Sequence, residues 1–177
     1  MVNSHLIRPS VEILAAGVLL SMLVQDWRWR GIHWYWFPLL AGLLLTSRLV
    51  AQPVDVVGVE WGVNLAFISI QLLLLAGYVK LRFRAWLLQY LGLGDILFWL
   101  TCAVYFPPAM FLLYHLVSLL AALGIFWAVQ KLSRQALSVR IPLAGLQAGV
   151  FVVVLLLSWG LRPYWPTTDE AVLAYFV

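Results

Sequence analysis

Two aspartates, Asp26 and Asp95, stand at the ends of strongly apolar stretches of the sequence. Asp95 lies in LGLGDILFWL, residues 91–100, and has no basic residue closer in sequence than Arg84. Two carboxyl groups held a few ångströms apart share a proton, because both cannot ionise easily. The ionised member can take a proton from water while the neutral member polarises a carbonyl group. If the two aspartates meet, they could hydrolyse an amide bond without a metal ion or a nucleophilic side chain.

The composition predicts a single-domain integral membrane protein. Of the 177 residues, 64% are hydrophobic and only 10% are charged, and the mean hydropathy is +0.98. Soluble domains are about 45–50% apolar and about 25% charged. The net charge of +4 is explained by membrane topology, so no nucleic-acid partner is expected. No cofactor or metal is expected either, because the sequence has one cysteine and none of the common phosphate-binding or zinc motifs.

A helix crosses the hydrocarbon core in about 20 residues, and the apolar stretches predict an all-α fold with six such helices. Ser10 is expected to cap the first one, and the chain would be a multi-pass protein. The six expected spans cover residues 7–26, 32–50, 60–79, 91–106, 108–130 and 141–161.

The basic residues predict the orientation of these spans. With six spans, one side of the membrane receives most of the 11 Lys and Arg residues: Arg28, Arg30, Lys80, Arg82, Arg84, Lys131, Arg134 and Arg140. The other side receives three: Arg8, Arg48 and Arg162. Positive charge favours the cytoplasmic side, so both termini are expected on the non-cytoplasmic side. Asp26 then ends the first span, and Asp95 begins the fourth, at the same cytoplasmic face.

The glycines beside Asp95 have two interpretations. Gly92 and Gly94 could leave the backbone open, so that a peptide substrate binds there in an extended form. They could equally serve close helix packing, as small residues do in membranes. Asp26 also has a simpler interpretation, a solvated pairing with Arg28 and Arg30.

Three segments resemble a known family. GLGD, residues 92–95, resembles the GxGD motif of intramembrane aspartyl proteases. DWRWRGI, residues 26–32, is similar to the first active-site segment of type IV prepilin peptidases and archaeal preflagellin peptidases, with Asp26, Arg28, Arg30 and Ile32 in register. IPLAGLQAG, residues 141–149, resembles the segment that opens the family's last helix. The motifs occur in the family's order and cover nearly the whole chain.

The resemblance implies an aspartic endopeptidase of the short, peptidase-only branch, in the inner membrane of a prokaryote. Its substrate would be a pilin-like or archaellin-like precursor, whose short cytoplasmic leader is removed from an apolar helix. The catalytic residues would be Asp26 and Asp95. The residues that bind or position the substrate would be Arg28, Arg30, Ile32, Gly92, Gly94 and Pro142. The basic loops would contact anionic lipid.

The sequence departs from the family at His33 and Trp34, where Pro-Asn is common, and at Leu97, where many bacterial members have lysine. His33 and His115 are candidates for lining the cavity. His115 could also pair with a carboxylate, or it could instead form a hydrogen bond between helices or lie near the outer interface. Residues 33–37, HWYWF, could form an aromatic belt at the membrane interface or contact the substrate helix near Asp26.

Two other functions stay open. A small transporter or channel subunit could use the aspartates as a proton or cation relay, although such sites usually lie near the membrane midplane. An inactive family member could act as a scaffold, and the departures at His33 and Leu97 are compatible with that function.

Overall fold

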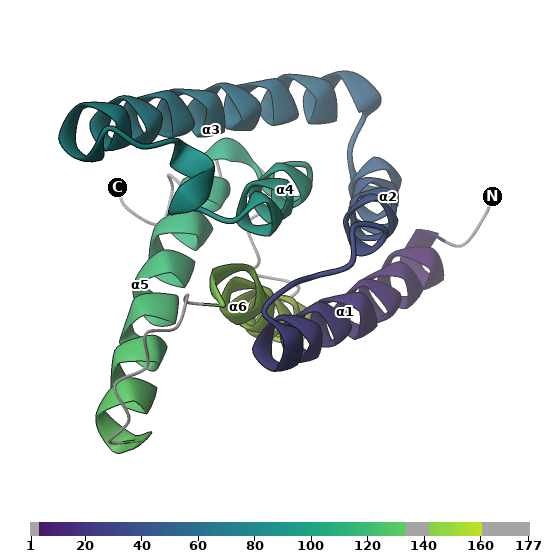
Figure 1. The fold of residues 1–177 in the computed structure, drawn as a ribbon. Coiled ribbons are helices and arrows are strands. Elements are labelled where there is room, and N and C mark those ends of the chain that lie inside the picture. Colours follow the sequence, from purple (N-terminus) through teal and green to yellow (C-terminus); the bar gives the residue numbers. More distant parts are fainter. Residues whose placement is uncertain (1–3, 134–141, 161–177) are drawn as a thin grey trace, which may run out of the picture.

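The computed structural model describes residues 4–133 and 142–160, and all regular structure in these residues is helical (Figure 1). Six α-helices and one short 3-10 helix follow each other along the chain. Their bounds are α1 Ser4–Trp29, α2 Trp36–Ala51, α3 Val54–Phe83, η1 Leu87–Gln89, α4 Leu93–Cys102, α5 Pro108–Ser133 and α6 Leu143–Gly160. The predicted all-α fold class is therefore confirmed.

Four of the six helices are long and apolar enough to cross a membrane. These segments are Ile7–Trp29, Val54–Phe83, Pro108–Lys131 and Leu143–Gly160. The other two helices are shorter, since α2 has 16 residues and α4 has 10. Helix α1 extends beyond its predicted span of residues 7–26: it already begins at Ser4, so Ser10 lies inside the helix and is not its N-cap.

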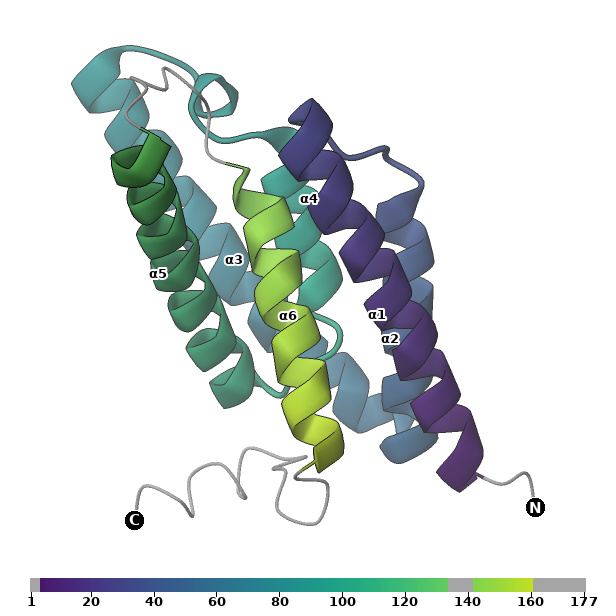
Figure 2. The same ribbon diagram turned by 90° about the horizontal axis from the view of Figure 1, so that it is seen from below.

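The helices form a bundle in which α1 packs against both α2 and α6, and α5 packs against α6 on the other side. Figure 2 shows that α1, α3 and α5 end, and α6 begins, at the same end of this bundle. The basic residues that follow or end these helices, among them Arg28, Lys80 and Lys131, therefore gather there. The opposite end carries the start of α1 and the end of α6.

The fourth predicted span, residues 91–106, is not helical in its last four residues. Helix α4 ends at Cys102, and residues 103–107 form a buried turn before α5 begins at Pro108. Such a turn exposes carbonyl groups that need donors when no water is near. The side-chain nitrogen of Asn64 on α3 supplies them, donating to Ala103 O at 2.8 Å and Phe106 O at 2.9 Å.

A buried carboxylate joins the helices at the end of the bundle where α1 begins. Glu12 is only 1% exposed. Its Oε1 accepts hydrogen bonds from Arg8 Nε at 2.9 Å, Ser47 Oγ at 3.0 Å and Tyr105 Oη at 3.3 Å. Its Oε2 accepts one from Trp159 Nε1 at 2.8 Å. Glu12 thereby connects α1, α2, the turn after α4 and α6.

We expect Glu12→Leu to destabilise the bundle by roughly 3 kcal/mol, because breaking a buried pair leaves the remaining charge and donors without their acceptor. The free energy of unfolding can be measured by titrating the detergent-solubilised protein with sodium dodecyl sulfate. Asp55→Leu is the matched control, since it removes an exposed carboxylate and should cost less than about 1 kcal/mol. Equal stability of the two variants would show that Glu12 does not hold the helices together.

Candidate active site

Asp26 lies one turn before the end of α1 and is 8% exposed. The helix stops because Arg30 adopts a left-handed conformation, with φ of 55°, and its N–H donates to Asp26 O at 3.0 Å. This stop turns the chain away toward α2. The Asp26 carboxylate faces α6, where its Oδ2 accepts a hydrogen bond from Gly145 N at 2.8 Å.

Asp95 lies in the first turn of α4. Its Oδ2 accepts a hydrogen bond from Gly92 N at 3.2 Å, which is the arrangement of a carboxylate that caps its own helix. Its Oδ1 accepts a second one from Ala144 N on α6 at 2.8 Å. Gly92 is extended, with φ of −68° and ψ of 143°. A Cβ atom at Gly92 would lie 3.0 Å from Asp95 Oδ2, so the absence of a side chain at Gly92 leaves space for the carboxylate.

The start of α6 connects the two aspartates. The first amides of a helix have no acceptor within the helix and carry its positive dipole end. Here Pro142 O accepts the first intrahelical bond, from Leu146 N, while the amides of Ala144 and Gly145 each hold one carboxylate. Consecutive amide nitrogens are only three backbone bonds apart. The two bonded carboxylate oxygens therefore lie within about 10 Å of each other.

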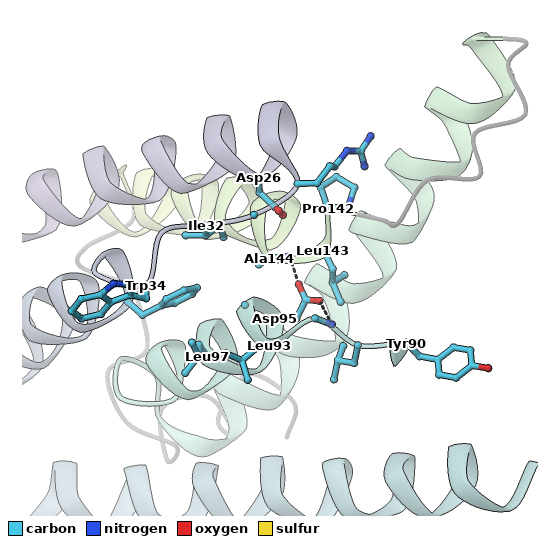
Figure 3. A pocket seen from close by; sticks show the side chains of 16 residues that line it. Asp26, Ile32, Trp34, Tyr90, Leu93, Asp95, Leu97, Pro142, Leu143 and Ala144 are labelled. Carbon is cyan, nitrogen blue, oxygen red and sulfur yellow. Dashed lines mark hydrogen bonds between the residues drawn. The ribbon is translucent and has the colours of Figure 1, made fainter. Parts of the chain in front are cut away.

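Both carboxylates open onto one pocket of about 520 Å³. Figure 3 shows Asp26 and Asp95 on either side of the start of α6, with Ile32 and Trp34 on one side of them and Tyr90 on the other. Most of the wall is apolar. The predicted site residues that line this pocket are Asp26, Arg30, Ile32, Gly92, Gly94, Asp95 and Pro142.

Three predicted site residues lie elsewhere. Arg28 is exposed and does not line the pocket. His33 is exposed, and its Nδ1 lies 3.0 Å from Gln25 Oε1, so the expectation that it lines the cavity is wrong. The α1–α2 linker turns this side chain back toward α1.

The expectation that His115 lines the cavity is also wrong. It is 3% exposed on α5 and packs among three aromatic rings. Their centroids lie 4.9 Å away for Trp99, 5.7 Å for Phe111 and 5.8 Å for Phe67. The alternative, a side-chain hydrogen bond between helices, is not seen at Nε2, which has no partner among the described residues.

The sequence interpretation missed the two residues that hold the carboxylates, Ala144 and Gly145. Backbone donors carry no side-chain signal, and the one signal in the sequence that could have indicated a close contact is the pair of small residues after Leu143. Gly145 is required sterically, because a Cβ atom there would lie 2.7 Å from the Cβ of Asp26. Leu97 and Trp34, identified above as departures from the family, also line the pocket.

No protein-family model matches this chain, and no curated protein or solved structure matches it either. Within residues 4–133 and 142–160, no cluster of three or more His, Cys, Asp or Glu side chains could hold a metal ion.

Proposed function

We propose that the chain is a membrane aspartyl endopeptidase that removes the short cytoplasmic leader from pilin-like precursors. The observation that carries this proposal is the pair of hydrogen bonds from Ala144 N and Gly145 N, each 2.8 Å long, to Asp95 and Asp26. Two carboxylates from distant parts of the chain are thus held on consecutive amides, in one pocket. If these contacts served only to cap the start of α6, the carboxylate of Asp95 alone would be sufficient.

The proposed reaction uses water as the nucleophile. One carboxylate takes a proton from a water molecule while the water oxygen attacks the scissile carbonyl carbon. The other aspartate, which is protonated, donates a hydrogen bond to the carbonyl oxygen. The tetrahedral intermediate collapses when the peptide nitrogen receives a proton and the C–N bond breaks. The amides of Ala144 and Gly145 keep both carboxylates in place during these steps, so little reorganisation is needed.

The shape of the pocket supports an extended peptide as substrate. Residues 90–92, just before α4, form part of its wall as irregular backbone, and a peptide needs such backbone groups to bind in an extended form. Ile32, Trp34 and Leu97 provide apolar contacts for the first residues of the precursor's apolar helix. The leader would stay outside the hydrocarbon region, at the basic end of the bundle.

The proposed topology has six membrane crossings with both termini on the non-cytoplasmic side. It is supported by the basic residues that gather where α1, α3 and α5 end (Figure 2). Helix α2 has 16 residues and is therefore about 24 Å long. Together with α4 and its buried turn, it would complete the crossings inside the bundle. With this topology, the two aspartates would lie at the cytoplasmic face.

We expect a periplasmic reporter, such as alkaline phosphatase, to be active when fused after Val177, and a cytoplasmic reporter to be inactive there. Fusions after Arg84 should give the opposite pattern, because that loop would be cytoplasmic. The measurement is enzyme activity per fusion protein in the membrane fraction. Activity of only the cytoplasmic reporter after Val177 would contradict the topology.

A transporter or channel with a carboxylate relay is the main alternative, and an inactive scaffold is the other. The position of both aspartates at one end of the bundle favours the peptidase over the relay, since transport sites lie near the midplane. A relay needs an ion gradient, whereas a peptidase does not. Incubation of the purified protein in detergent with a pilin-like precursor, followed by gel electrophoresis, therefore separates the three functions.

A further inference from the structure

A second set of hydrogen bonds lies one helical turn beyond the two aspartates. Gln147 on α6 is fully buried, and its Oε1 accepts a hydrogen bond from Trp99 Nε1 on α4 at 2.8 Å. Its Nε2 donates to Ser118 Oγ on α5 at 3.1 Å, and its backbone O accepts one from Tyr114 Oη at 3.0 Å. One side chain of α6 is thus fixed to α4 on one side and to α5 on the other.

The bond between Trp99 and Gln147 joins the same two helices, α4 and α6, as the bond between Asp95 and Ala144 in the candidate active site. Trp99 follows Asp95 by four residues on α4, and Gln147 follows Ala144 by three residues on α6. Residues three or four apart lie on the same face of a helix. The bonds Asp95–Ala144 and Trp99–Gln147 therefore join the same faces of the same two helices, one turn apart.

We propose that Trp99 and Gln147 are positioning residues, which fix the rotation and depth of α6 so that the amides of Ala144 and Gly145 meet the two carboxylates. This inference rests on the proposed function for its effect on cleavage, but its structural part stands alone. Neither residue lines the pocket, so neither contacts the substrate.

The geometry of a helix explains why such a fixing point is needed. A slip of one residue rotates a helix by about 100° and moves it by about 1.5 Å, which would turn both amides away from the aspartates. Apolar contacts alone resist such a slip weakly, because lipid and protein interiors are equally apolar. A buried side chain with a partner at both polar atoms defines a single register, since any other register leaves these groups unpaired.

The test uses Trp99→Phe, which keeps an aromatic ring and removes the donor, and Gln147→Met, which keeps the length and removes both polar atoms. The control is Trp159→Phe, which likewise removes one indole donor. Trp159 lies on α6 at the opposite end of the bundle, where it donates to Glu12. The first readout is hydrogen exchange at the amides of Ala144 and Gly145, followed by NMR in detergent micelles with 15N-alanine and 15N-glycine labels. It does not depend on activity.

We expect exchange at both amides to become at least about tenfold faster in Trp99→Phe and in Gln147→Met, with Gly17 on α1 unchanged. In the precursor cleavage assay, kcat should fall about tenfold in each variant while KM changes less than about twofold. The double variant should be no worse than the worse single one, because the two residues act as a unit. Gln147→Glu, whose neutral acid can accept from Trp99 and donate to Ser118, should restore both readouts.

Unchanged amide exchange in both variants would overturn the inference, whatever happens to cleavage. A fall in kcat with unchanged exchange would show that the residues act by another route and would also overturn it. If the wild-type protein cleaves no precursor but the exchange results hold, the proposed function fails and the positioning of α6 stands. If Trp159→Phe gives the same exchange as Trp99→Phe, the effect is general loosening of the bundle, and the inference is wrong.

Discussion

Asp26→Asn and Asp95→Asn are each expected to lower the rate of precursor cleavage by at least about 1000-fold, the scale on which a general acid or base contributes. Asparagine cannot take a proton from water, nor donate one as a carboxylic acid does. Its side-chain oxygen can still accept the backbone hydrogen bond from Gly145 N or Ala144 N. The variants should therefore stay folded, because the substitution is nearly isosteric and removes a group that is costly to bury. The measurement is kcat/KM with purified protein in detergent.

The double variant should be no less active than the worse single one, since residues that act as a unit fail together. Asp55→Asn is the matched control: it makes the same chemical change at an exposed carboxylate on α3 that does not line the pocket. We expect its activity to be within about twofold of wild type. Independent, multiplicative losses in the double variant would argue against a shared proton and against the dyad.

Gly145→Ala is expected to lower cleavage by at least about 100-fold without removing any functional group. The added Cβ would lie 2.7 Å from the Cβ of Asp26 and 2.9 Å from its Oδ2. The first of these atoms is fixed to the α1 backbone, so the clash cannot be relieved by rotating a flexible side chain. Either α6 or the end of α1 must move, and a displacement of about 1 Å at a catalytic group can cost about 100-fold. The measurement is kcat/KM, together with a check of folding by thermal unfolding in detergent.

Gly149→Ala is the control for this prediction because it makes the same change four residues later on α6. There the nearest atom to the new Cβ would be Leu23 Cδ2 at 3.4 Å, the end of a flexible side chain. We expect nearly full activity, since alanine also favours helix. If Gly145→Ala is as active as Gly149→Ala, the close contact between α6 and Asp26 is not needed for catalysis.

The sequence alone predicted the helical class and the position of both aspartates at one end of the bundle. Apolar stretches and the distribution of basic residues assigned Asp26 and Asp95 to the same end of the bundle, and both line one pocket. These features could be predicted because the hydrophobicity of a whole segment indicates a membrane span, and the basic residues between the spans indicate their orientation. Ile32 and Pro142, which only the family resemblance implied as residues that bind or position the substrate, also line the pocket.

The details that sequence reasoning missed depend on backbone geometry. The early end of α4 at Cys102 follows from a buried turn that Asn64 satisfies from 39 residues away along the chain, and no local pattern marks such a contact. The donors at Ala144 and Gly145 are main-chain groups, so their role has no side-chain signature. His115 was misplaced because a polar residue in an apolar helix indicates burial but not the direction in which it is buried.

The most direct test of the proposed function is the cleavage of a purified pilin-like precursor by the purified wild-type protein in detergent, without a membrane or an ion gradient. Mass spectrometry of the products would identify the bond that is cut. We predict a single cut between the short leader and the apolar helix with the wild-type protein, and no product with Asp95→Asn at equal concentration. No cleavage by the wild-type protein, or equal cleavage by wild type and Asp95→Asn, would contradict an aspartyl peptidase built on Asp26 and Asp95.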